Sequence, residues 1–175
     1  RILIKNPHVQ VVAVNDLTDA ATLAHLMKHD SVHGTADFAV AADGDFLVLD
    51  GKRIRVYAEK DPQLIPFGDL GAQVVLECTG IFTKKKTASA HIRGTVSHVI
   101  ISAPADDADR TVVMGINEQL VDLAKESVLS NASCTTNCLA PMVQVLDQTF
   151  GIEFGLMTTI HSYTNDQRIL DLPHK

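Results

Sequence analysis

Residues 9–16 read VQVVAVND, a nearly continuous apolar run with several β-branched side chains that ends at an acidic residue. Such a run is typical of a strand buried on both faces, as strands are in a parallel sheet covered by helices. Thr18 or Asp19 can then cap a helix over residues 20–28, in which three large apolar side chains share one face. The pattern predicts a strand followed by a crossover helix.

Downstream, the pattern changes to short alternating segments and then returns to buried strands. Residues 38–57 are broken at Asp43-Gly44 and Asp50-Gly51, two hairpin-turn dipeptides, which favours a small antiparallel insertion. The remaining predicted elements are strands over residues 72–77, 98–102, 111–115 and 127–129, helices over 83–90 and 135–150, and a final strand over 154–160.

Strands that alternate with helices indicate an α/β protein with a parallel, doubly wound sheet of the Rossmann type. We assign residues 1–133 to this sheet domain and residues 134–175 to the beginning of a second, α+β domain. The chain opens at Arg1 without a Met and closes at Lys175 directly after a patterned segment, so we expect both ends to be cuts in a longer protein. The glycine-rich loop of such a sheet is expected about 20 residues before Asp16, upstream of Arg1.

The composition limits the classes of function. Hydrophobic residues make up 46% of the 175 residues, but no apolar run approaches the roughly 18 residues that a membrane span needs. With 15 Lys and Arg against 21 Asp and Glu, the net charge of −6 leaves no broad basic surface for nucleic acid. Three cysteines without an apolar signal segment favour a reducing, cytoplasmic compartment. We expect no membrane or nucleic-acid partner and no metal site.

Cys134 is the first candidate for chemistry, because it stands in the polar segment SNASCTTNC, residues 130–138, at the start of a predicted helix. Unpaired backbone N–H groups and the macrodipole at a helix N-terminus favour a thiolate, which makes such a cysteine an activated nucleophile. Many cysteines are instead small buried hydrophobes, but the flanking hydroxyl groups argue against an apolar pocket here. Cys138 and Cys78 are interpreted as structural residues of the core.

His161 follows an apolar segment and opens a polar run. A histidine in this setting can reach a cysteine on a nearby helix, and Cys–His pairing is a common way to keep a thiol ionised near neutral pH. Spacing alone does not establish the contact, and a surface histidine fits the pattern equally well. The other seven histidines, His91 among them, are interpreted as solvated or helix-face residues.

Asp16 directly follows the strand at residues 9–14. Dinucleotide-binding folds place a carboxylate at such a strand end, where it accepts hydrogen bonds from the adenosine ribose and repels a 2′-phosphate. Asp also ends many strands for turn chemistry alone, so both interpretations remain open.

Two segments, SNASCTTNC at residues 130–138 and TTIHSYTNDQ at residues 158–167, resemble the signature segments of the glyceraldehyde-3-phosphate dehydrogenase family. The resemblance spans essentially the whole chain, since it extends to residues 14–19, 59–62, 77–80, 101–104 and 171–175. It implies that residues 1–133 are an N-terminally truncated NAD-binding domain and residues 134–175 the truncated beginning of a catalytic domain.

The resemblance implies NAD-dependent oxidation and phosphorylation of glyceraldehyde 3-phosphate to 1,3-bisphosphoglycerate. Cys134 would form a thiohemiacetal and then a thioester that inorganic phosphate cleaves, and His161 would act as its base. The implied phosphate contacts are Ser133 and Thr135 for the attacking phosphate, and Thr164 and Asp166 for the phosphate of the substrate.

The resemblance also implies how NAD binds. The matching positions are Asp16 at the adenosine ribose, Lys60 at the adenine, and Thr79, Gly80, Ser102 and Ala103 around the nicotinamide half. Leu17 and Leu172-Pro173 resemble the branch of the family that prefers NAD, so we expect NAD over NADP. The family is usually tetrameric, which implies a homotetramer.

Two other functions remain open. Erythrose-4-phosphate dehydrogenase shares the cysteine segment, although residues 163–165 (YTN) resemble the enzymes that act on the triose. A non-catalytic thiol redox sensor or nucleotide-binding fragment would need Cys134 but could dispense with His161.

Overall fold

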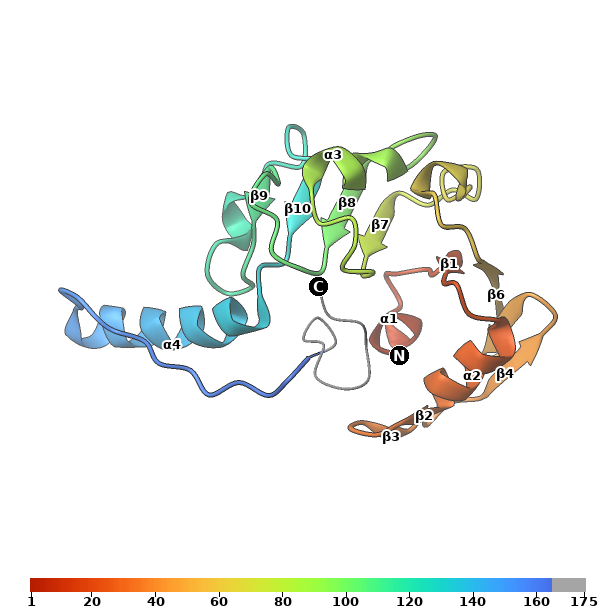
Figure 1. The fold of residues 1–175 in the computed structure, drawn as a ribbon, viewed down its shortest axis with the longest axis horizontal. Helices are drawn as coiled ribbons and strands as arrows, with labels where there is room; N and C mark the ends of the chain where they lie inside the picture. Colours follow the sequence, from red (N-terminus) through yellow and green to blue (C-terminus); the bar gives the residue numbers. More distant parts are fainter. Residues whose placement is uncertain (165–175) are drawn as a thin grey trace, which may run out of the picture.

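The computed structural model describes residues 1–164 and shows an α/β fold with two four-stranded sheets and one long helix (Figure 1). The first sheet has the strand order β1-β6-β5-β4. β1 (Ala13–Asn15) pairs in parallel with β6 (Lys52–Tyr57), and β5 (Phe46–Leu49) and β4 (Val40–Asp43) add antiparallel strands. The antiparallel insertion predicted from the two Asp-Gly dipeptides is present.

The turn between β5 and β6 shows why an Asp-Gly dipeptide stands there. Asp50 and Gly51 both have positive φ, 50° and 77°, as a two-residue hairpin turn of type I′ requires. β1 is shorter than predicted, because only residues 13–15 lie opposite residues of β6.

Helix α2 (Ala20–Lys28) follows β1 with the predicted bounds and covers the first sheet. The carboxylate of Asp19 caps it by accepting the backbone N–H of Thr22 at 2.8 Å. Ala20 and Ala24 are small enough for the helix to pack closely on the sheet, and they lie buried against Leu47, Leu49, Ile54 and Val56. Short elements flank this unit: α1 (Ile2–Lys5), β2 (His29–Asp30) and β3 (Gly34–Thr35).

The second sheet is entirely parallel, with the strand order β7-β8-β10-β9. Its strands are β7 (Val74–Glu77), β8 (His98–Ile101), β9 (Arg110–Thr111) and β10 (Val128–Ser130). α3 (Lys85–Ala88) and η2 (Ser89–His91) form the crossover from β7 to β8, while η1 (Pro62–Leu64) and η3 (Glu118–Leu120) lie in other connections. Because the strands are parallel, their carboxyl ends lie at one edge of the sheet.

The α/β class and the parallel sheet are confirmed, but the strands are divided between two four-stranded sheets and the small antiparallel pair β2-β3. β1 and β7 each lie at the end of their own strand order, so each pairs with one strand only. Val12, directly before β1, packs against the core beneath the second sheet, which contains Val75, Val99 and Val128. Apolar contact therefore joins the two halves where strand pairing does not.

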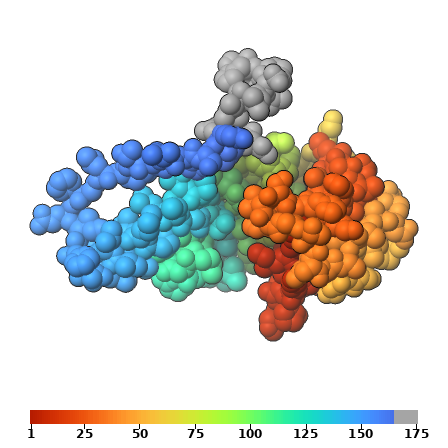
Figure 2. Space-filling model, turned by 90° about the horizontal axis from the view of Figure 1, so that it is seen from below, coloured from red at the N-terminus to blue at the C-terminus, as the bar shows by residue number. Residues whose placement is uncertain are grey.

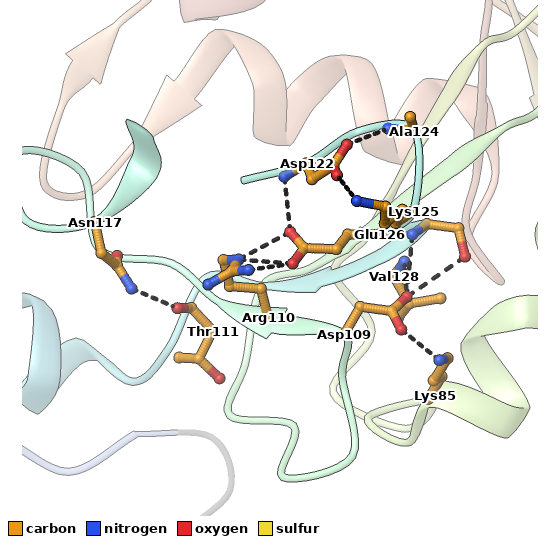
Figure 3. A network of polar contacts seen from close by, with 11 residues as sticks. Lys85, Asp109, Arg110, Thr111, Asn117, Asp122, Ala124, Lys125, Glu126 and Val128 are labelled. Carbon is orange, nitrogen blue, oxygen red and sulfur yellow. Dashed lines mark hydrogen bonds and ion pairs between the residues drawn. The ribbon is translucent and has the colours of Figure 1, made fainter. Parts of the chain in front are cut away.

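A polar network joins β9 to the segment that enters β10 (Figure 3). Oδ2 of Asp109 accepts the backbone N–H groups of Ser127 (3.0 Å) and Val128 (2.9 Å), and Oδ1 forms an ion pair with Lys85 of α3. The ammonium group of Lys85 is the main cause that lowers the pKa of Asp109, and the two amides add to it against the effect of burial. One carboxylate thus connects α3 with the second sheet.

Arg110 and Glu126 form the other part of this network (Figure 3). Nε of Arg110 lies 2.9 and 2.8 Å from the two carboxylate oxygens of Glu126, and a terminal guanidinium nitrogen completes a bidentate pair. Glu126 also accepts the backbone N–H of Asp122 at 3.0 Å. Because β9 has only two residues, it forms few backbone hydrogen bonds with β10, and the Arg110–Glu126 ion pair stabilises this edge strand.

Helix α4 (Cys134–Phe150) projects away from the second sheet (Figure 1), and none of its residues is buried. Residues 151–164 run back beside it without forming a helix or strand, as Figures 1 and 2 show. The predicted strand over residues 154–160 is therefore wrong. No strand among residues 1–164 pairs with this segment, and Leu156 and Ile160 are fully exposed.

Within residues 1–164, the helices are too short or too polar to cross a bilayer. The same residues contain no group of three or more His, Cys, Asp or Glu side chains arranged to hold a metal ion.

Replacing Asp109 with Asn should lower the free energy of unfolding at pH 7 by about 1–3 kcal/mol, because two backbone amides and Lys85 lose a charged acceptor. Folding lowers the pKa of Asp109 and Glu126 from 3.8 and 4.5, so the unfolded chain binds more protons as the pH falls through this range. The stability that these carboxylates supply is thus present above pH 4.5 and lost below it. Urea unfolding at pH 7 and pH 3.5 measures both effects.

The exposed Asp69 is a matched control, since its change to Asn should leave stability within about 0.5 kcal/mol. Equal stability of the Asp109→Asn variant and the unchanged protein at pH 7 would show that the network contributes nothing.

Candidate active site

Cys134 is the first residue of α4 and is exposed. Ser133 caps the helix, because its hydroxyl oxygen accepts the backbone N–H of Thr136 at 2.9 Å. The sulfur therefore lies beside backbone N–H groups that the helix does not use, including that of Thr135. This is the position predicted from the polar segment before the helix.

The structure brings His161 to this sulfur, with Nε2 3.1 Å from Sγ of Cys134. Nδ1 of His161 lies 2.5 Å from the backbone oxygen of Ser162. A hydrogen on Nδ1 satisfies that carbonyl and leaves the lone pair of Nε2 facing the thiol. In this tautomer the imidazole is placed to receive the proton of the thiol.

The pKa of Cys134 is lowered from its ordinary value of 9.0. The main cause is the hydrogen bond with His161; desolvation opposes it, and the backbone N–H of Thr135 lowers the pKa further. The two neighbours thus increase the fraction of thiolate at neutral pH, as nucleophilic chemistry requires.

Ser130, the last residue of β10, fixes the short connection between the sheet and Cys134. It is fully buried, its hydroxyl donates to the backbone oxygen of Ala103 (2.7 Å), and its oxygen accepts the N–H of Ala132 (3.1 Å). Ala132 has a φ of 57°, a left-handed conformation that turns the chain from strand to helix.

The side chain of Asn137 closes the same connection from the helix. Its Nδ2 donates to the backbone oxygens of Asn131 (2.8 Å) and Ser133 (2.9 Å), and the N–H of Asn131 bonds to the oxygen of Ile101 at 2.9 Å. The start of α4 is therefore held by both β8 and its own first turn.

The predicted nicotinamide contacts lie at the carboxyl edge of the same sheet. Thr79 and Gly80 follow β7, Ser102 and Ala103 follow β8, and the backbone N–H of Ser102 bonds to the oxygen of Glu77 at 3.0 Å. Gly80 has a φ of 71°, which a residue with a Cβ adopts only at a cost. Open α/β sheets bind their ligands at this edge.

The two predicted adenosine contacts are also brought together. Asp16 follows β1, and Lys60 follows Glu59 in the segment after β6. Asn15 joins the segments with a reciprocal pair: its Nδ2 donates to the oxygen of Glu59 and its Oδ1 accepts the N–H of Glu59, both at 2.9 Å. Asp16 is exposed and borders a cavity of about 990 Å³, and its Oδ1 accepts the backbone N–H of Thr18 at 3.0 Å, so the carboxylate also has the turn role that the sequence left open.

Of the remaining predicted contacts, Ser133 and Thr135 flank Cys134, and Thr164 is exposed. Asp166 lies outside the described residues.

Two interpretations of the sequence were wrong. Cys78 and Cys138 are exposed rather than part of the core. Cys78 is on the outward side of the alternation that buries Val75 and Glu77, and α4 has no buried side at all. His91 is buried rather than solvated, because it pairs with Glu77.

The sequence did not identify four residues whose hydrogen bonds hold the loops around the candidate site: Asn15, Glu77, Ser130 and Asn137. Each acts on backbone groups or on a buried partner that only the folded chain brings near. The one available signal was a charged residue, Glu77, at the end of an apolar strand run.

A parallel α/β sheet with polar loops at its carboxyl edge, next to a helix that begins at an imidazole-paired thiol, defines a dinucleotide-binding protein with a candidate cysteine nucleophile. Residues 1–85 match the family model described as "Glyceraldehyde 3-phosphate dehydrogenase, NAD binding domain", and residues 133–175 match "Glyceraldehyde 3-phosphate dehydrogenase, C-terminal domain". The chain belongs to the glyceraldehyde-3-phosphate dehydrogenase family, and NAD is the cofactor that these matches indicate.

Individual relatives agree along the whole chain. It is 59% identical over 175 residues to glyceraldehyde-3-phosphate dehydrogenase 1 of Bacillus cereus. It is 57% identical to the glyceraldehyde-3-phosphate dehydrogenase of Geobacillus stearothermophilus and 52% identical to that of Clostridium acetobutylicum. In each case the match covers all of this chain and 52% of the relative. The chain therefore spans about half the length of the curated relatives it matches.

Changing Ser130 to Ala should lower the free energy of unfolding by about 1–3 kcal/mol, because the buried oxygen of Ala103 and N–H of Ala132 lose their partner. Chemical denaturation measures this loss. The same change at the exposed Ser97 should cost no more than about 0.5 kcal/mol, and equal effects at the two serines would contradict the role given to Ser130.

Proposed function

We propose that the protein containing this chain is an NAD-dependent, phosphorylating dehydrogenase that converts glyceraldehyde 3-phosphate to 1,3-bisphosphoglycerate. The observation that carries the proposal is the 3.1 Å contact between Sγ of Cys134 and Nε2 of His161 at the start of α4. Membership in the family supports the choice of substrate and reaction.

In this mechanism Cys134 is the nucleophile. Its thiolate attacks the aldehyde carbon and forms a C–S bond, and the carbonyl oxygen becomes an alkoxide that takes up a proton. His161, which holds a proton on Nε2 once the thiol has ionised, lies where it can supply that proton and later remove it again. The imidazole thus serves both the formation and the oxidation of the thiohemiacetal.

Oxidation turns the thiohemiacetal into a thioester. NAD, when bound, supplies an acceptor for the hydride that leaves the former aldehyde carbon. Inorganic phosphate then attacks the thioester, the C–S bond breaks, and Cys134 leaves as the thiolate with which the cycle began. Its lowered pKa makes it a good leaving group as well as a nucleophile.

The phosphate contacts are assigned by position. We place Ser133 and Thr135 at the attacking phosphate, because both flank the sulfur at a helix N-terminus, where backbone N–H groups favour anions. Thr164 and Asp166 are assigned to the phosphate of the substrate. The cofactor contacts proposed are Asp16, Lys60, Thr79, Gly80, Ser102 and Ala103.

We further propose a cytoplasmic homotetramer. The three cysteines are free thiols, which suits a reducing compartment. The domain division proposed is an NAD-binding domain over residues 1–133 and the beginning of a catalytic domain from residue 134.

At pH 7, iodoacetamide should alkylate Cys134 at least about tenfold faster than Cys78 or Cys138 of the same protein, because the thiolate is the reactive form. A pKa below 9.0 increases the thiolate fraction at pH 7. Changing His161 to Asn should slow alkylation of Cys134 alone. Peptide mass spectrometry of timed samples gives all three rates, and equal rates would refute the proposed activation.

The His161→Asn variant also separates an enzyme from a redox sensor. Loss of the base should lower kcat of the full-length protein by about 10²- to 10⁴-fold. A protein that shows no turnover but whose oxidation of Cys134 by peroxide is unaffected by the variant would be a sensor instead.

Changing Asp16 to Ala should raise the ratio of kcat/KM with NADP to kcat/KM with NAD by about 10- to 100-fold, because a carboxylate repels the 2′-phosphate of NADP. Initial rates with the two cofactors measure the ratio. The Asp45→Ala variant, altered at an exposed hairpin residue, should keep the original ratio. An unchanged ratio in the Asp16 variant would remove this residue from the ribose site.

A further inference from the structure

Glu77 and His91 form a buried polar pair outside the Cys134–His161 contact. Both residues are 5% exposed, Glu77 at the end of β7 and His91 at the end of η2. Oε2 of Glu77 lies 3.1 Å from Nε2 of His91. The proposed mechanism uses neither side chain.

The carboxylate of Glu77 is fully engaged by donors. Oε1 accepts the backbone N–H of Thr79 at 2.8 Å and also the hydroxyl of Thr79, while Oε2 faces His91. Burial raises the pKa of Glu77, but the hydrogen bonds from His91 and Thr79 outweigh it and leave the pKa below its ordinary value. The carboxylate thus remains an acceptor at neutral pH.

The backbone of Glu77 holds the neighbouring loop as well. The backbone oxygen of Glu77 accepts the N–H of Ser102 at 3.0 Å. The backbone oxygen of Ala103, which follows Ser102, accepts the hydroxyl of Ser130. One residue therefore anchors the loops after β7 and β8, which in turn meet the segment that leads to Cys134. These loops form the carboxyl edge of the sheet, where cofactors bind in open α/β folds.

His91 is held in one orientation. Its ring lies 6.0 Å from the ring of Phe67, and Nδ1 is buried without a partner among residues 1–164. A hydrogen on Nε2 therefore serves Glu77, whereas a hydrogen on Nδ1 would be a buried donor without an acceptor. The surroundings of the pair therefore favour one tautomer of His91, with its hydrogen on Nε2.

Stability alone does not explain this pair. A buried ionic pair often contributes no more than apolar residues of the same volume would, because desolvation offsets the attraction. Its distinctive property is geometric, since it fixes the backbone of Thr79 relative to β7 and η2.

We propose that Glu77 and His91 are positioning residues that preset the loops Thr79–Gly80 and Ser102–Ala103 for the nicotinamide-ribose half of NAD. The proposal rests on the proposed function for NAD as the ligand. Neither residue touches the cofactor, and both act through the backbone of Thr79 and Ser102.

The test compares NAD with ADP, which lacks both the nicotinamide and its ribose, by calorimetric titration of the full-length protein. His91→Leu should weaken NAD binding by about tenfold, as expected for an uncompensated buried carboxylate that releases its loop, and change ADP binding by less than about twofold. His91→Gln, which keeps a donor near Nε2, should restore most of the loss.

Two further variants complete the experiment. Glu77→Gln should show the same selective loss, and it tests the proposal if the Leu variant does not fold. His98→Leu, a matched control at the opposite end of β8, should alter neither affinity.

Equal losses for the two ligands, or unchanged NAD binding by folded variants, would overturn the positioning role and leave the proposed function intact. Failure of the unchanged protein to bind NAD would overturn the proposed function and this role with it.

Discussion

The parallel pairing of β10 between β8 and β9 is the constraint on which the candidate site depends. It aligns Ser130 with Ile101 and Thr111, so that three strands end together. Only residues 131–133 separate this strand from α4. The sheet therefore determines where the sulfur of Cys134 lies, and the hydrogen bonds of Ser130 and Asn137 remove the freedom that so short a connection would still have.

Polar side chains at the ends of strands hold the loops around the site in a similar way at three places. Asn15, Glu77 and Ser130 each stand at the carboxyl end of a strand and use a side chain to hold the backbone of the following or a neighbouring loop. The residues proposed to contact ligands are thus held in place by polar side chains that are not themselves proposed to contact a ligand. Such support limits the movement of loops, which would otherwise be the least ordered part of a parallel sheet.

The sequence predicted the elements whose signals are local. The bounds of α2, the hairpins at Asp-Gly and the start of α4, predicted at residue 135 and found at Cys134, follow from capping residues and turn chemistry. The prediction of a strand over residues 154–160 was wrong, because an apolar segment forms a strand only when a neighbouring strand pairs with it. The burial of His91 and the anchoring by Asn15 depend on contacts between residues 14 and 44 positions apart, which periodicity does not reveal.

The short connection from β10 to α4 has a genetic consequence. Val128 is completely buried two residues before Ser130, so a smaller side chain there would leave a void directly beneath the strand that leads to Cys134. Any settling of the strand into that void would shift the thiol relative to the imidazole. An allele with a smaller residue at this core position would then disturb the contact between Cys134 and His161 as well as lower the melting temperature.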